Sequence, residues 1–372
     1  MRIYLDNNAT TQIHPDVLAV FDDTLRTVFG NASSIHKEGQ IARQVIEDAR
    51  ESVARLISAA AREIVFTSGG TESNNAAIFG AAGFASRHHI VTTAIEHPSV
   101  LEPVTELKRR GHEVTIVPPK RSGSVDAAAV IDAIRPETRI VAVMLANNET
   151  GVIQPVAEIA RACRERGIHV HCDAVQAAGK IDIDVEALAV DTLSLSAHKM
   201  HAPKGIGALY VRRGTTMDAQ LLGGAQERRR RAGTENVPLA AAFGAAASLA
   251  GEHPFRSDVA QLRDRFESSL GVLPVTVNGA AESRIPNTSN ITFRGADGEG
   301  IVIALDLSGV AVSTGSACSS GRIEPSGVLL AMGLSAEEAK STVRFSLSRF
   351  TTPIEIDTAA ALLREIVPRC MR

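Results

Sequence analysis

The sequence predicts an α/β fold, with a mostly parallel sheet of seven strands followed by a smaller α+β unit. Seven short apolar or β-branched segments punctuate the first two thirds of the 372-residue chain, beginning at Glu63, Ile90, Glu113, Arg139, Ile168, Asp191 and Gly207. Helical patterns lie between several of these segments. Strands that alternate with helices are typical of a parallel sheet, because each strand needs a crossover to return.

Two segments show the apolar spacing of an amphipathic helix. From about Gly39 to Ile57, apolar residues recur every three or four positions, which predicts a helix before the first strand. After Pro155, a suitable first helical residue, the same stripe continues from Val156 to Cys163. Both helices are expected to pack one face on the sheet.

The pattern of predicted strands and helices changes near Glu252 to Pro254. Beyond that point, strands are expected at Val275, Asn290 and Ser341, mixed with helices. This pattern predicts a second, smaller α+β domain from residue 253 onward, after a large domain that ends at residue 252.

Composition excludes several classes of function. Lys and Arg number 39 against 42 Asp and Glu, a net charge of −3, and aromatic residues make up only 3%. The chain lacks the net positive charge that attracts polyanions and has few aromatic side chains on which bases could stack. Nucleic acid is therefore not expected as a partner. The N-terminus lacks the apolar stretch of a secretion signal, the charge-free windows are too short to span a bilayer, and the four cysteines form no CxxC pair. We therefore expect a cytoplasmic protein that does not enter a membrane.

The segments that follow the strands are polar, and in open parallel sheets ligands bind outside these carboxyl ends. One of them, "TSGGTESNN", places Gly69 and Gly70 after a strand and Thr71 at the start of a helix. The free amides of that helix could hold a phosphate, although a simple strand-to-helix turn would have the same sequence. No GxxxxGK[ST] motif is present, which excludes a P-loop enzyme.

A lysine and an aspartate follow consecutive strands. Lys199 lies in "SLSAHKMHAPKG", and Asp173 ends the preceding strand 26 residues earlier, a separation suited to one strand-helix-strand return. A lysine there could form a Schiff base with a carbonyl, with Lys204 as the alternative. An opposing carboxylate would keep the ring nitrogen of pyridoxal phosphate protonated, so that the ring accepts electrons from a carbanion.

A metal site is the alternative for the same strand. "HVHCD" places His169, His171 and Asp173 on one face at alternate positions. A hydrolase of this type would usually carry a further histidine where Ala174 stands. We therefore interpret the two histidines as sheet or pocket-wall residues and predict no metal.

Three further basic features have two readings each. His97, in "AIEHPSV", could cap a helix or cover a flat ring and shuttle protons. Arg344 could be a strand-end charge or a clamp for a carboxylate. The run from Arg228 to Arg231 is expected to form a local anion or interface patch, since the chain as a whole is acidic.

Cys318 differs from the other cysteines in its surroundings. It lies in a Ser- and Gly-rich stretch, about residues 313–321, that predicts a mobile loop, whereas Cys163 and Cys172 fit core positions and Cys370 lies near the end. A mobile loop permits the exposure that a nucleophilic thiol needs but does not prove it.

Taken together, these segments resemble a known enzyme family. The likeness covers "YLDNNATT", "GNASSIH", "FTSGGTESNN", "EHPSV", "NNETG", "CDAVQAAGK", "SAHKMHAPKGIGALYVRR", "RRAGTENV", "STGSACSSG" and "RFSLSRFTT", in order and nearly end to end. The sequence resembles the pyridoxal-phosphate-dependent cysteine desulfurases of the nitrogen-fixation and iron-sulfur-cluster assembly type, which are class V aminotransferases.

The resemblance implies the aminotransferase-like fold of type I, assembled as a homodimer. The large domain would comprise residues 15–252, and the small domain residues 1–14 and 253–372. Lys199 would form the Schiff base, Asp173 would hold the pyridine nitrogen, and His97 would stack on the ring as an acid and base. The remaining roles would be Gln176 on the ring hydroxyl, Asn148 on cofactor and substrate, Gly70, Thr71, Ser196 and His198 on the phosphate with Thr234 from the neighbouring subunit, and Arg344 on the substrate carboxylate.

The implied activity is conversion of L-cysteine to L-alanine. Sulfur would pass to Cys318 as a persulfide and then to an acceptor protein, such as an iron-sulfur scaffold, for cluster or thio-cofactor synthesis. Two alternatives stay open: a selenocysteine lyase or another class V enzyme of the same fold, and a non-catalytic sulfur-relay protein.

Overall fold

The computed structural model describes residues 2–83, 87–252, 256–315 and 324–371. All seven expected strands are present, and they form one sheet in the order β2-β8-β7-β6-β5-β3-β4. Only β8 runs antiparallel to its neighbours in this sheet. The strand bounds are β2 Ile64–Thr67, β3 His89–Thr93, β4 Glu113–Val117, β5 Thr138–Ala142, β6 His169–Asp173, β7 Thr192–Ser196 and β8 Gly207–Val211. The predicted α/β class and the seven-stranded, mostly parallel sheet are confirmed.

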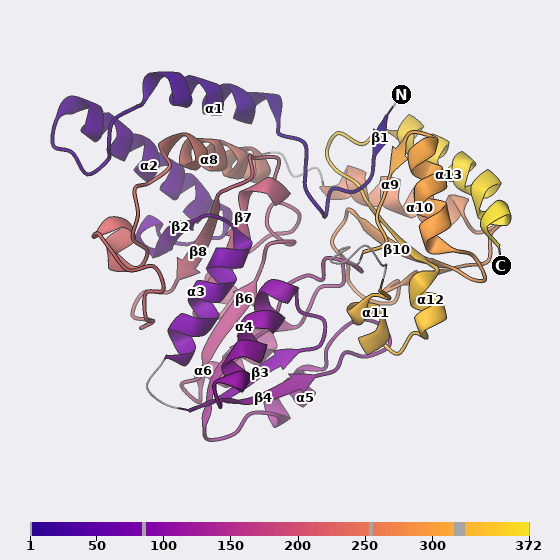
Figure 1. Cartoon of the computed structure of the whole chain (residues 1–372), viewed down its shortest axis with the longest axis horizontal. Coiled ribbons are helices and arrows are strands. Elements are labelled where there is room, and N and C mark those ends of the chain that lie inside the picture. The colour runs from indigo at the N-terminus through magenta and orange to yellow at the C-terminus, as the bar shows by residue number, and fades with distance from the viewer. Residues whose placement is uncertain (1, 84–86, 253–255, 316–323, 372) are drawn as a thin grey trace.

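Helices cover both faces of this sheet (Figure 1). Ile140 and Ala142 of β5 pack with the neighbouring helices α3 and α4, whereas Val141 between them belongs to the cluster on the other face. Alternate residues of one strand therefore bury against different layers, as a doubly covered parallel strand requires. The helices of this part are α1 Pro15–Thr27, α2 Lys37–Leu56, α3 Gly70–Ala82, α4 Pro98–Arg109, α5 Ala127–Asp132, α6 Val156–Arg164, α7 Val185–Leu188 and α8 Val237–Glu252.

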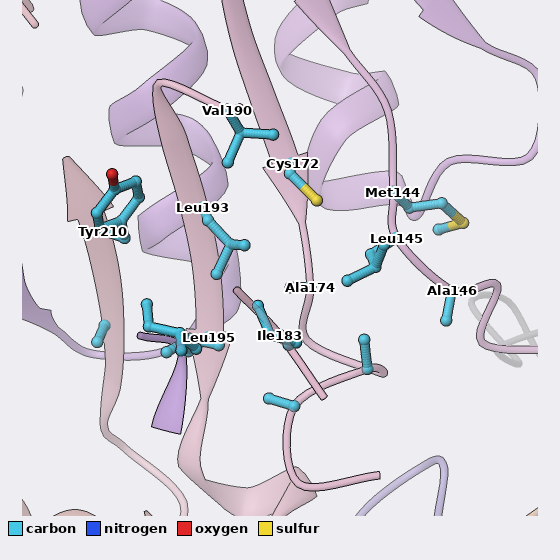
Figure 2. Packing of buried hydrophobic residues seen from close by; sticks show 14 of the residues in the cluster. Met144, Leu145, Ala146, Cys172, Ala174, Ile183, Val190, Leu193, Leu195 and Tyr210 are labelled. Atoms are coloured by element: carbon cyan, nitrogen blue, oxygen red, sulfur yellow. The ribbon is translucent and has the colours of Figure 1, made fainter. Parts of the chain in front are cut away.

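The largest hydrophobic cluster lies on that second face (Figure 2). Cys172 of β6 and Leu193 of β7 are fully buried there beside Leu145. The helix α8 packs closely on α2, since a Cβ at Gly244 would lie 2.6 Å from the Cα atom of Ala49. The predicted helices correspond to α2 and α6, although Pro155 precedes α6 rather than beginning it.

The smaller unit has its own sheet and its own hydrophobic cluster. Strands β12, β10 and β9 form an antiparallel sheet in that order, and β1 pairs with β11 in parallel. Its elements are β1 Ile3–Tyr4, α9 Arg256–Ser269, β9 Val275–Asn278, β10 Thr288–Phe293, α10 Gly298–Leu307, β11 Val310–Ala311, α11 Gly327–Ala331, α12 Ala336–Lys340, β12 Thr342–Ser346 and α13 Pro353–Ile366. The three strands expected in this part are confirmed.

The two ends of the chain meet in this unit (Figure 1). Ile3 and Leu5 are buried in the same hydrophobic cluster as Phe266, Phe293 and Phe345. That cluster supports grouping the N-terminal segment with the C-terminal part of the chain, although Val328, Leu329 and Ala339 pack in the larger cluster. The predicted division into residues 15–252 and residues 1–14 with 253–372 stays a prediction. None of the helices in the described part of the chain has the length and apolarity to cross a bilayer.

Candidate active site

One cavity of about 200 Å³ lies at the carboxyl ends of the large sheet. The strands β2, β3, β5, β6 and β7 each lead into a segment that lines it. The structure thereby brings together nine of the predicted residues: Gly70, Thr71, His97, Asn148, Asp173, Gln176, Ser196, His198 and Lys199. Their individual roles stay predictions.

The turn before α3 forms a cradle that only glycine permits. A Cβ at Gly70 would lie 2.7 Å from Cγ2 of Val175, and a Cβ at Gly207 would lie 2.7 Å from the backbone of Gly69. With no side chain at Gly69 to cap the helix, the first amides of α3 have no local acceptor. A helix start of this kind, open to a cavity, suits a phosphate group.

Asp173 is held by two donors. Its carboxylate accepts hydrogen bonds from Nδ2 of Asn74 at 2.8 Å and from the backbone amide of Val175 at 3.0 Å. Asn74 in turn lies 2.9 Å from Nε2 of His171 and donates to Oγ of Ser99 at 2.8 Å. This network fixes the direction in which the carboxylate faces the cavity.

His97 presents a defined nitrogen to the cavity. Its Nδ1 accepts from the backbone amide of Ser99 at 3.1 Å and lies 2.7 Å from Oγ of the same residue. Since Nδ1 accepts, the proton of the neutral ring resides on Nε2. Surrounding protein lowers the pKa of His97 through desolvation; Asp173 opposes this effect, and Lys199 adds to it.

Lys199 directs its amine toward the N-terminal segment. Nζ donates to the backbone carbonyls of Asn8 and Ala9, the latter at 2.8 Å. Desolvation and the positive charge of Arg344 lower the pKa of Lys199 to about 8, against the attraction of Asp173 and Asp6. A larger fraction of this amine is unprotonated at neutral pH than in an ordinary lysine. The alternative, Lys204, is exposed and does not line the cavity.

Arg344 lies just behind the cavity wall. Its guanidinium donates to the backbone carbonyl of Asn148 at 3.1 Å and to the carboxylate of Asp6 at 2.7 Å, while its buried Nε has no hydrogen-bond partner. The reading of Arg344 as a strand-end charge is wrong, because the residue lies in the middle of β12, where pairing with β10 buries it.

The structure does not place two further predicted residues at this cavity. Thr234 is exposed and does not line it within one subunit, and Cys318 lies outside the described residues. Two residues of the arginine run make intramolecular ion pairs: Arg231 bonds Glu72 at 2.9 Å, and Arg228 lies 3.5 Å from Glu47. The expected anion or interface patch stays a prediction.

The histidines proposed for a metal are occupied by neighbours. His169 and His171 both lie within 3.0 Å of Oγ1 of Thr192, and His171 also bonds Asn74. In the described part of the chain, no group of three or more His, Cys, Asp or Glu residues could hold a metal ion.

Sequence reasoning missed four polar residues of this region: Asn74, Ser99, Asn8 and Lys180. Each of the four lies in a segment named in the sequence analysis, but the predicted roles there belong to neighbouring residues. Spacing could have found Asn74, one helical turn after Gly70, and Lys180, one turn after Gln176. No local signal marks Asn8, because its partners are distant in sequence.

Comparison with known proteins identifies the family of this chain. Residues 3–358 match the aminotransferase class-V family. The chain belongs to this family. A cysteine desulfurase of Enterobacter agglomerans is 47% identical over 372 residues, covering 99% of this chain and 93% of the relative. Cysteine desulfurase IscS of Anaeromyxobacter dehalogenans is 48% identical over 376 residues, covering 98% of this chain and 92% of the relative. The resemblance drawn from the motifs is confirmed.

Solved structures agree with the fold of this class V chain. A NifS-like protein superposes with a TM-score of 0.93 at 35% identity, covering 99% of this chain and 100% of the other. A protein called SspA, solved in complex with cysteine, has a TM-score of 0.85 at 36% identity over 95% of this chain and 100% of its own. The predicted aminotransferase-like fold is confirmed.

Proposed function

We propose that this class V enzyme is a cysteine desulfurase that uses pyridoxal phosphate to convert L-cysteine to L-alanine. The observation that carries the proposal is the cavity that Lys199 and Asp173 share with the open start of α3. The similarity to cysteine desulfurases over the whole chain supports it.

The residues of the cavity fit pyridoxal phosphate by their chemistry. The amides of Gly70 and Thr71, with Ser196 and His198, offer donors to a phosphate, and Thr234 of a second subunit would complete that set. Asp173 would offer a carboxylate to a protonated ring nitrogen, and Gln176 and Asn148, which line the cavity, would hold the ring from its wall. When bound, the cofactor supplies an electron sink for a carbanion.

In this proposal, the residues at and behind the cavity wall act on the substrate, and Cys318 supplies the thiol. Arg344, whose guanidinium lies behind the wall at Asn148 and Asp6, is the cation that orients the α-carboxylate. Lys199, with its pKa near 8, takes the α-proton of cysteine, and His97 moves protons at Nε2. The thiolate of Cys318 accepts the substrate's sulfur as a persulfide. The carbon-sulfur bond breaks, and its electron pair is protonated to give alanine.

The residues that flank the segment carrying Cys318 meet beside the cavity. Ser326 donates a hydrogen bond to the buried carboxylate of Glu149, and a Cβ at Gly315 would lie 3.0 Å from the same carboxylate. Glu149 follows Asn148 of the cavity wall directly. This arrangement supports delivery of the Cys318 thiol to the cavity.

The enzyme is proposed to be a cytoplasmic homodimer that hands its sulfur to an acceptor protein, such as an iron-sulfur scaffold. Four large apolar side chains in the described part of one subunit are more than 80% exposed: Phe29 at 83%, Ile35 at 92%, Leu222 at 85% and Leu307 at 84%. Exposure of this extent supports a subunit interface. The name IscS of one relative supports a role in iron-sulfur cluster synthesis.

Mass spectrometry after incubation with L-cysteine tests the function. The protein loaded with pyridoxal phosphate is expected to gain one sulfur atom, about 32 Da, on the peptide that contains Cys318. Cys318→Ala is expected to keep the bound cofactor but form neither the added sulfur nor sulfide, whereas Cys370→Ala serves as the matched control and retains both.

Two results would contradict this assignment. Unchanged sulfide release by Cys318→Ala would move the activity to another class V reaction. Release of selenide from selenocysteine without turnover of cysteine would favour the selenocysteine lyase.

A further inference from the structure

A second lysine is buried directly behind the cavity. Lys180 lies in the turns that follow β6 and is only 4% exposed. Its Nζ donates to Oε1 of Gln176 at 2.7 Å and to Oδ1 of Asn8 at 3.2 Å. A lysine buried to this degree needs a structural or functional reason, because removing its amine from water is costly.

The hydrogen-bond partners of Gln176 fix the orientation of its amide. Oε1 of Gln176 faces Lys180, whose amine has hydrogens to donate in either protonation state. A backbone carbonyl only accepts, and Nε2 of Gln176 donates to that of Asn8 at 2.9 Å. The second hydrogen of Nε2 is left for the cavity that Gln176 lines.

Asn8 is held in one orientation by the same reasoning. Its Nδ2 donates to the backbone carbonyl of Asn148 at 3.1 Å and to Oγ1 of Thr288 at 2.8 Å. Its Oδ1 therefore faces Lys180 and Nδ2 of Asn287, the latter at 3.0 Å. The amine of Lys180 thus lies between two amide oxygens whose directions are set by groups that cannot reverse their roles.

We propose that Lys180 is a positioning residue that holds Gln176 as a hydrogen-bond donor toward the cavity, and so toward the ring oxygen of the bound cofactor. This inference rests on the proposed function and deepens it. Without Lys180, the amide of Gln176 loses one of the two partners that keep its carbonyl away from the ring. A carbonyl facing an anionic oxygen would repel it, whereas an N–H stabilises it.

The charges around Lys180 agree with a role in hydrogen bonding. Desolvation and the cations of Lys199 and Arg344 lower the pKa of Lys180 well below its ordinary value. A neutral amine still has two hydrogens for its two amide acceptors. A cavity of about 20 Å³ beside Lys180 and Lys199 has room for one water, which would form the remaining hydrogen bond of the Lys180 amine.

The test is a pH titration of the visible absorbance of the protein loaded with pyridoxal phosphate. A donor on the ring oxygen disfavours protonation of the chromophore, so Lys180→Met is expected to raise the titration midpoint by about one pH unit. Its affinity for pyridoxal phosphate, measured by equilibrium dialysis, is expected to fall about tenfold. Lys204→Met removes the same charge at an exposed site and should change neither quantity.

A double-mutant cycle distinguishes positioning from charge. In a Gln176→Ala background, Lys180→Met is expected to move the midpoint by less than about 0.3 unit, because its effect passes through Gln176. An equal shift in both backgrounds, or no shift in the native background, overturns the proposal. Circular dichroism reports whether each variant folds.

A second variant, Lys180→Gln, tests the proposal if Lys180→Met does not fold. Lys180→Gln removes the positive charge but retains an N–H donor, so the proposal expects a midpoint within about 0.3 unit of the native protein. A rise of a full unit in this variant would overturn it. Absence of any visible absorbance in the native protein would instead refute the proposed function, which keeps the two failures distinct.

Discussion

Two buried polar clusters flank the cavity, and they are assembled in different ways. The Asp173 cluster consists of Asp173, Asn74, His171, Ser99 and His97, and all its members lie in or beside the large sheet and its helices α3 and α4. The Asn8 cluster consists of Asn8, Gln176, Lys180, Lys199 and Asn287. Its bonds join residues separated by as many as 279 positions.

The difference shows which side of the site depends on the small unit. Packing of adjacent strands and helices is sufficient to place the Asp173 cluster, because its residues all lie in or beside one sheet. The amine side is complete only when the N-terminal segment and the segment around Asn287 close over Lys199.

The largest effect is expected from removing the amine of Lys199, one of the two lysines of the Asn8 cluster. Lys199→Ala should abolish the visible absorbance given by pyridoxal phosphate and lower desulfurase activity by at least about a thousandfold, because no other lysine lines the cavity among the described residues. Absorbance spectra and sulfide release measure these losses. Lys204→Ala is the control and should retain both, whereas an intact absorbance band in Lys199→Ala would assign the covalent bond to another lysine.

The same substitution in the two clusters should have unequal effects. Asn74→Asp places a second carboxylate against Asp173, so the free energy of unfolding at pH 8 should fall by about 4 kcal/mol. Asn8→Asp keeps the acceptor for Lys180 and loses two donors, and a fall of about 1 to 2 kcal/mol is expected. Urea denaturation of the cofactor-free proteins measures both values.

The dependence of the Asn74→Asp effect on pH gives the control. Repulsion raises the pKa of the shared carboxylates in the folded state above its unfolded value, so the deficit is complete above the folded pKa and shrinks as the pH falls toward 4. A deficit that is the same at pH 5 and pH 8 would contradict repulsion as its cause. An effect of Asn8→Asp larger than that of Asn74→Asp would reverse the contrast between the clusters.

The smallest effect concerns the reactivity of Lys199 in the cofactor-free protein. With its pKa lowered to about 8 by desolvation and Arg344, the unprotonated fraction should rise from about a tenth at pH 7 to about nine tenths at pH 9. Trinitrophenylation of Lys199, followed by mass spectrometry of its peptide, should accelerate about ninefold over this range and then level off. A rate that still rises roughly sevenfold from pH 9 to pH 10 would indicate an ordinary amine.

The strands and the Asp173 side were predictable because their signals are local. Each strand is a short apolar run, and the residues that follow it, such as Asp173 and His97, must reach one edge once the strands are parallel. The pairing of Asp173 with Lys199 at one rim followed from a single crossover. Arg344 was misread as a strand-end charge because the bounds of a strand are poorly marked in sequence.

The order of the elements, the mostly parallel sheet and the group of side chains at its carboxyl edge were predictable from the sequence, because apolar periodicity and short crossovers act over tens of residues. The folded chain was needed to show that Asn8 connects Lys180, Gln176 and Lys199, and that Glu227 is buried against Arg50 at 2.6 Å. Such contacts join distant segments. They form only when two hydrophobic cores have packed and each buried polar atom has to find its partner among whatever side chains the packing brings near.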